Sequence, residues 1–78
     1  MTTDYQPVSC SFHSELELAI MQRRCLQLGW LEAGRKHVTM ITPVDLQTRN
    51  GEEFLLATDN NETRYCIRLD RIIQLDVR

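Results

Sequence analysis

The period of the hydrophobic residues changes once along this chain, and that change limits the possible folds more than any other feature. Over residues 14–24 the apolar side chains Leu16, Ala19 and Ile20 follow the i, i+3, i+4 spacing of one helix face. From Cys25 onward apolar and polar residues alternate with a period of two, which is the pattern of strands with one buried face. The chain therefore predicts one N-terminal helix followed by a sheet.

The residue types at both ends of the predicted helix fit its direction. Ser14 is placed to cap the free backbone amides, and Glu17 completes a Ser-x-x-Glu capping box. Glu15 and Glu17 would lie at the positive end of the helix dipole, with Arg23 and Arg24 at its negative end. The acidic start and basic end thus have a structural explanation.

Five short segments after the helix predict strands. Turn residues separate them at Ala33-Gly34 and Asn50-Gly51, while Pro43 cannot donate to a sheet ladder and predicts a bend followed by a short irregular piece. The expected strands cover residues 25–32, 35–42, 52–59, 63–69 and 72–77.

Strands this short protect their edges best by curling, so we expect a mostly β fold, a small barrel of five bent antiparallel strands with one N-terminal α-helix. An Sm-like barrel places its helix before the first strand, whereas an OB-fold usually places it between the third and fourth strands. The Sm-like order fits. We expect one domain over residues 1–78, with an extended leader (1–13), the helix (14–24) and the barrel (25–78). The predicted core includes Leu26, Leu28, Tyr65, Ile67, Ile73 and Leu75.

Size, charge and cysteine usage exclude several classes of protein. A chain of 78 residues forms one domain of modest stability, and it contains no apolar run long enough to cross a bilayer and no signal-peptide pattern at its start. We expect a cytoplasmic protein without membrane contact. Cys10, Cys25 and Cys66 are odd in number and widely spaced, so we expect free thiols, with Cys25 the most buried.

Catalytic and metal sites are poorly supported. Cys10 and His13 are close in sequence, but nothing marks an orienting third group or an oxyanion site. His13, His37 and the cysteines match no recognised metal-ligand spacing. We therefore expect a protein that is not an enzyme and has no cofactor.

An Sm-like RNA-binding module is the alternative function. Its basic residues would be Arg35, Lys36, Arg64, Arg68 and Arg71. Against it, residues 25–78 hold 7 basic and 8 acidic residues, and the net charge of the chain is −2. A protein that binds nucleic acid through phosphates normally has a basic excess, so direct RNA binding is not expected.

Four segments resemble one bacterial family. They are "DYQPVSCS", "ELELA" in the predicted helix, "VDLQTRNGEEFL" around the predicted turn, and "TRYCIRLDRI" near the end. In this order and spacing they are similar to the Rof (YaeO) family, Rho-specific inhibitors of transcription termination. The resemblance runs from Tyr5 to about Leu75.

The resemblance implies an Sm-like binding protein without catalysis. Members of the family attach to the N-terminal RNA-binding region of the Rho hexamer and keep RNA from its primary site. On this basis the expected partner is Rho, in competition with RNA, through an acidic helix start that meets a basic surface. The candidate contact residues are Ser14, Glu15 and Glu17 in the helix, and Arg49 and Asn50 in the turn.

Overall fold

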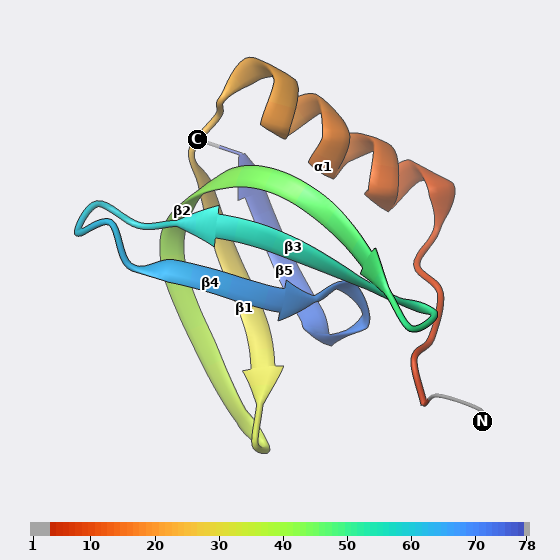
Figure 1. Ribbon diagram of the computed structural model, residues 1–78. Coiled ribbons are helices and arrows are strands. Elements are labelled where there is room, and N and C mark those ends of the chain that lie inside the picture. The colour runs from red at the N-terminus through yellow and green to blue at the C-terminus, as the bar shows by residue number, and fades with distance from the viewer. Residues whose placement is uncertain (1–3, 78) are drawn as a thin grey trace.

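The computed structural model describes residues 4–77 of the chain (Figure 1). Within these residues the chain forms one helix, five antiparallel strands and a short 3-10 turn. The elements are α1 (Cys10–Gln22), β1 (Leu26–Glu32), β2 (Arg35–Arg49), β3 (Glu52–Thr58), β4 (Arg64–Arg68), η1 (Leu69–Arg71) and β5 (Ile72–Val77). The predicted mostly β fold with an N-terminal helix is confirmed at this level.

Helix α1 begins one turn earlier than predicted. Its cap is Ser9, whose hydroxyl oxygen accepts a hydrogen bond of 3.1 Å from the backbone amide of Phe12. Ser14 consequently lies inside the helix, so the predicted Ser14 to Glu17 capping box is wrong. The first turn contains no acidic residue, and the predicted dipole contacts of Glu15 and Glu17 are wrong for the same reason.

The buried face of α1 explains the earlier start. Phe12 packs against the core one turn before the buried residues Leu16 and Ala19, so it lengthens the apolar stripe toward the N-terminus. Leu18 and Met21, which also lie within the predicted apolar segment, are 52% and 80% exposed because only a narrow face of the helix meets the sheet. The helix ends before residue 23, which adopts a left-handed conformation.

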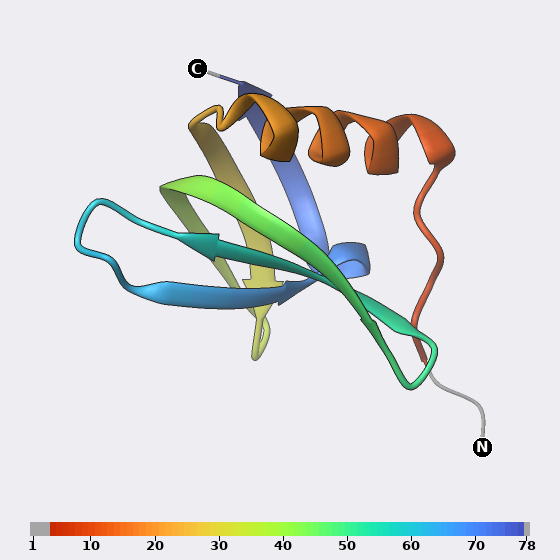
Figure 2. The same ribbon diagram turned by 45° about the horizontal axis from the view of Figure 1, so that its top comes forward.

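Strand β2 is a single strand of 15 residues, so the predicted irregular piece after Pro43 is wrong. Pro43 is accommodated by a β-bulge. The register passes from Pro43 opposite Ala57 to Asp45 opposite Leu56, which leaves Val44 as the additional residue. The first part of β2 pairs with β1 and the second part with β3, and the sheet bends between these two parts (Figures 1 and 2).

The sheet has the strand order β4-β3-β2-β1-β5, with every pairing antiparallel. Four of the strands pair with their neighbours in the sequence, and β5 returns to pair with β1. Among the described strands β4 and β5 are edges that do not pair with each other, so the sheet stays open and the predicted closed barrel is not formed. Helix α1 lies along one side of this bent sheet (Figure 2).

The core lies inside the curve of the sheet, under α1. Of the predicted core, Leu26, Leu28 and Ile67 are buried, and Tyr65 and Leu75 are partly buried and pack against it. Ile73 is 50% exposed, which contradicts the prediction. The cause is an irregular register of β1 with β5: Gly29 pairs with Gln74 and Trp30 with Ile72, so Ile73 is skipped and points outward.

The leader is only partly as predicted. Its described part before the helix is extended, yet Tyr5 is buried in the core, and residues 1–3 lie outside the described part of the chain.

The three cysteines are free, and Cys25 is the least exposed of them, as predicted. In the described residues no helix has the length and apolar character required to cross a membrane.

Candidate functional site

The predicted contact residues of α1 are all exposed, but they do not form one patch. Each residue turns the helix by about 100°, so residues two apart face nearly opposite ways. Glu15 lies on the flank near Leu75 of β5. Glu17 lies on the other flank, at a groove of about 300 Å³ that runs between α1 and β2 and has Ile20 and Leu46 in its wall. The charge at the helix start is therefore divided between two surfaces.

Glu17 is joined to the sheet through His13. The Nδ1 atom of His13 lies 2.7 Å from Oε1 of Glu17, one turn later on α1. The Nε2 atom of the same ring lies 3.2 Å from Oε1 of Glu53, on β3. The His13 side chain is 30% exposed and those of Glu17 and Glu53 are 57% and 32% exposed, so a partner in solution can reach all three. We call these three residues the His13 bridge.

Tyr5 holds Glu53 from the opposite side. Its hydroxyl donates a hydrogen bond of 3.0 Å to Oε2 of Glu53. Burial of the phenol, together with this hydrogen bond and the nearby carboxylate charge, raises the pKa of Tyr5 to about 12. Both oxygens of Glu53 therefore have partners, one from the leader and one from α1.

The turn between β2 and β3 is exposed and belongs to the same hairpin as Glu53. Asn50 and Gly51 occupy left-handed conformations with φ of 52° and 79°, as the predicted Asn-Gly turn requires. Arg49 donates a hydrogen bond of 2.8 Å to the side chain of Gln47, and its guanidinium lies 5.5 Å from the centre of the Phe54 ring. The His13 bridge thus ties α1 to the hairpin that carries Arg49 and Asn50.

A second ionic cluster surrounds Arg68 of β4, and we call it the Arg68 cluster. The Arg68 Nε atom lies 2.6 Å from Oδ1 of Asp70, and Nη1 lies 2.8 Å from Oδ1 of Asp4 and 3.5 Å from Oε2 of Glu52. The backbone amide of Gln6 donates to the other oxygen of Asp70 at 3.0 Å. The side chains of Arg68 and Asp70 are only 14% and 8% exposed, so the central pair of this cluster is largely removed from solvent, whereas Asp4 is 74% exposed.

The electrostatics of the Arg68 cluster favour its charged forms. Burial alone would raise the pKa of Asp70, but hydrogen bonds from Arg68 and from the Gln6 amide outweigh it and hold that pKa below its usual value. The hydrogen bond and charge of Arg68 lower the pKa of Asp4. Hydrogen bonds to Asp70 and Asp4 raise the pKa of Arg68 in turn. Arg68 is therefore charged at neutral pH, and the carboxylates around it more than compensate its charge.

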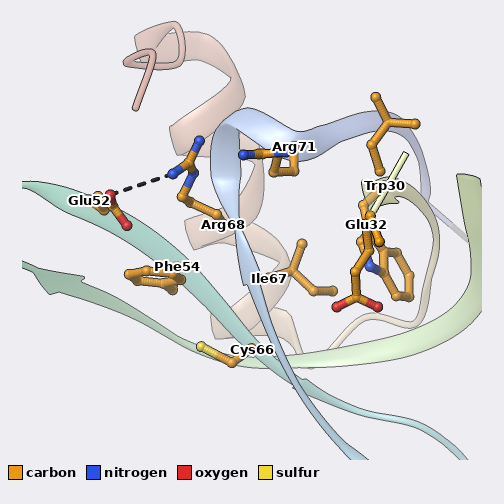
Figure 3. A pocket seen from close by; sticks show the side chains of 10 residues that line it. Trp30, Glu32, Glu52, Phe54, Cys66, Ile67, Arg68 and Arg71 are labelled. Atoms are coloured by element: carbon orange, nitrogen blue, oxygen red, sulfur yellow. Dashed lines mark hydrogen bonds and ion pairs between the residues drawn. The ribbon is translucent and has the colours of Figure 1, made fainter. Parts of the chain in front are cut away.

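A shallow hollow of about 340 Å³ lies beside Arg68 (Figure 3). Its wall includes Trp30, Phe54, Cys66 and Arg71. The guanidinium of Arg68 is directed toward Glu52 across this hollow, so its charge is paired with a carboxylate of the same chain (Figure 3). Among the residues described here, no group of three or more His, Cys, Asp or Glu side chains is arranged to hold a metal ion.

Comparison with known proteins supports the fold alone. No protein-family model and no curated protein matches the sequence. A solved structure, proteasome accessory factor B/C (PafBC) of Arthrobacter aurescens, is similar with a TM-score of 0.77 and 19% sequence identity. The alignment covers 94% of this chain and 12% of that protein. This chain is thus similar in fold to a small part of a much longer protein.

The sequence analysis missed the contacts of His13 with Glu17 and Glu53, and the support that the buried Tyr5 gives to Glu53. His13 and Glu17 have the i, i+4 spacing of a helical pair, and this signal becomes visible once the helix start is placed at Ser9. Glu53 and Tyr5 carry no such signal, because they are 48 residues apart and meet only in the folded chain.

Proposed function

We propose that this protein is a Rof-type inhibitor of Rho-dependent transcription termination. It binds the N-terminal RNA-binding region of Rho in the cytoplasm, as a protein ligand and not as an enzyme, and blocks RNA from the primary site. The observation that carries the proposal is the accessible pair of carboxylates, Glu17 and Glu53, on α1 and on the β2–β3 hairpin. The sequence resemblance supplies the identity of the partner.

Electrostatics supports competition with RNA. A protein surface that accepts RNA phosphates is basic, and carboxylates directed at such a surface occupy the positions of the phosphates. Asp45 of β2 adds a third carboxylate at the same groove as Glu17. Apolar side chains next to these groups, Ile20 and Leu46, offer contact area for the aliphatic stems of lysine or arginine.

We propose further that the open sheet is an Sm-like arrangement. A helix before the first strand and a strongly bent sheet of five antiparallel strands support this reading. In such an arrangement α1 covers one end of the sheet and presents Glu17 beside the hairpin.

Direct RNA binding is less well supported than Rho binding. Arg68, one of the basic residues that an RNA-binding module would use, is compensated by Asp4, Glu52 and Asp70. Arg71 is 46% exposed and lies 3.7 Å from Asp4. Both arginines therefore face carboxylates of the same chain.

Reversing the charge of Glu17 tests the proposal. Glu17→Lys removes an attraction and adds a repulsion, whereas Glu17→Gln removes only the attraction, so the loss of affinity for Rho should be larger for lysine. Loss of a close charge pair in a partly desolvated interface costs about 2 to 5 kcal/mol, which is about 30-fold to several-thousand-fold in affinity. The measurement is a titration of Rho at low and high salt, with binding expected to weaken as salt rises.

A matched control is Glu62→Lys, which makes the same charge change in the exposed turn between β3 and β4. It should bind Rho as the parent protein does. Equal binding by Glu17→Lys and the parent would contradict the proposed contact surface. If none of the proteins binds Rho while the parent retains RNA in a filter-binding assay, the RNA-binding alternative replaces the proposed function.

A further inference from the structure

Both nitrogens of the His13 ring face a carboxylate oxygen. Nδ1 lies 2.7 Å from Glu17 and Nε2 lies 3.2 Å from Glu53, and both carboxylates accept hydrogen bonds but cannot donate them when ionised. A neutral imidazole has one N–H and can donate to only one of them. Only the protonated ring, with an N–H on each nitrogen, satisfies both contacts at once.

Protonation of histidine changes within the physiological range of pH, because imidazole gains or loses its proton between about pH 5 and 8. The His13 bridge carries a formal charge of −1 when the ring is protonated and −2 when it is neutral, since it contains two carboxylates and one imidazole. When the proton leaves, one of the two carboxylates also loses its attractive contact with the ring.

We propose that His13 is a protonation-dependent latch on the partner-binding surface. In its protonated form it holds Glu17 and Glu53 to itself, and in its neutral form it releases one of them to a cationic partner. This inference rests on the proposed function, because the released carboxylate acts on the basic surface of Rho. The expected consequence is that affinity for Rho increases as pH increases from 5.5 to 8.

The surroundings of His13 favour this behaviour. From α1 it faces Glu17, from β3 Glu53, and across the groove from β2 Asp45. The phenol of Tyr5 reaches the same site through its hydrogen bond to Glu53. The contact with Glu17 is the shorter one and has hydrogen-bond geometry, so a neutral ring keeps its N–H on Nδ1. The group set free is Oε1 of Glu53, while Tyr5 still holds Oε2 of the same carboxylate.

Two substitutions fix the latch in its two states. His13→Gln is neutral at every pH and should bind Rho with the affinity of the parent at pH 8. His13→Lys is cationic at every pH in this range and should bind as weakly as the parent at pH 5.5. For the parent the expected difference between pH 5.5 and 8 is about three- to tenfold in affinity, the size of one charge near a solvated interface. The measurement is Rho affinity at four pH values for each protein.

His37→Gln is the matched control, because His37 is the other histidine of the chain and lies near a single carboxylate, Glu32, at 3.7 Å. It should keep the pH profile of the parent. Any pH dependence that belongs to Rho appears equally in all four proteins and cancels in the comparison. Identical profiles for the parent and His13→Gln would overturn the latch while leaving the proposed function intact.

A second measurement uses the protein without Rho. Nitrogen NMR of the His13 ring should show protons on both nitrogens at pH 5.5, both in hydrogen bonds, and one proton lost at pH 8. Glu17→Gln should remove the signature of the Nδ1 bond only. If this titration is seen but Rho binds none of the variants, the proposed function fails and the latch needs another partner; if the low-pH ring shows no bond to either carboxylate, the latch itself is wrong.

Discussion

The Arg68 cluster and the His13 bridge both attach the N-terminal part of the chain to the sheet, but they differ in their exposure to solvent. Each attaches one strand of the sheet to the N-terminal part of the chain through a nitrogen-bearing side chain that lies between carboxylates. Arg68 is 14% exposed and its guanidinium stays charged at all accessible pH values, whereas His13 is 30% exposed and lies between two carboxylates that a partner in solution can reach. One small domain thus holds a largely buried ionic contact at Arg68 and Asp70 and a solvent-accessible one at His13.

Tyr5 connects the two ionic centres. Its ring lies 5.8 Å below the guanidinium of Arg68, and its hydroxyl donates to Glu53 of the His13 bridge. It is also the one residue of the described leader that is buried in the core. Removing different parts of Tyr5 therefore separates the contributions of the two centres.

The largest expected effect is that of Tyr5→Ala. Loss of a buried aromatic ring typically costs about 3 to 5 kcal/mol, and this substitution also releases the leader from both centres. Tyr5→Phe keeps the ring over Arg68 and removes only the hydrogen bond to Glu53, at a cost of about 1 kcal/mol. Urea denaturation of both variants checks the difference. Equal losses would mean that the ring contributes nothing beyond its hydroxyl.

Arg68→Gln should have the next largest effect, and it should change the response to acid. Asp70 and Asp4 have lowered pKa values in the folded protein, so they bind protons less readily than in the unfolded chain. Their contribution to stability is full above about pH 4 to 5 and is lost as pH falls through the folded pKa values. Without Arg68 the free energy of unfolding should be lower at pH 7 and should decline less steeply between pH 5 and 2.5.

A matched substitution in the same strand is Arg64→Gln, because Arg64 is exposed on β4. It should leave the free energy of unfolding at pH 7 unchanged, and also the decline of that free energy between pH 5 and 2.5. If the free energy of unfolding of Arg68→Gln declines between pH 5 and 2.5 as steeply as that of the parent, the lowered pKa values of Asp70 and Asp4 do not depend on Arg68.

The smallest expected effect on stability is that of His13→Gln. The His13 bridge is accessible to solvent, and an exposed ion pair contributes about 0 to 1 kcal/mol. The melting temperature should therefore change little at pH 7, whereas the part of the proposed pH dependence of Rho binding that comes from His13 should disappear. A loss as large as that of Arg68→Gln would mean that the bridge is a structural contact like the Arg68 cluster.

The strand pattern could be read from the sequence because apolar and polar residues alternate along it, and the structure keeps this alternation in part, as in the buried residues Leu26, Leu28 and Trp30. Irregular features could not be read in this way. The bulge at Pro43 keeps β2 continuous, and the skipped residue Ile73 leaves Ile72, and not Ile73, packed against the core at the start of β5. Both depend on how two strands are aligned, and that alignment is set by the folded sheet and not by either segment alone.

The site was predicted only in part, for a related reason. Glu17 was identified, but it was placed at the helix start beside Glu15, whereas it lies in the middle of α1 on the opposite flank. Because the helix start was predicted one turn too late, Glu15 and Glu17 were both assigned to the first turn of the helix, where neither lies. Contacts between distant segments, such as His13 with Glu53, leave no periodic signal in the sequence.

The strand order has a consequence for how the chain folds. Three of the four strand pairs join consecutive strands through short turns, and only the pair of β1 with β5 joins strands that are distant in the sequence. Short loops close at low entropic cost and rapidly, while distant segments meet later. In refolding from denaturant we expect the amides of β2 and β3 to gain protection from hydrogen exchange first and those of β5 last. Until β5 docks, β1 remains an open edge next to an unfinished core, and this intermediate is the species most exposed to aggregation.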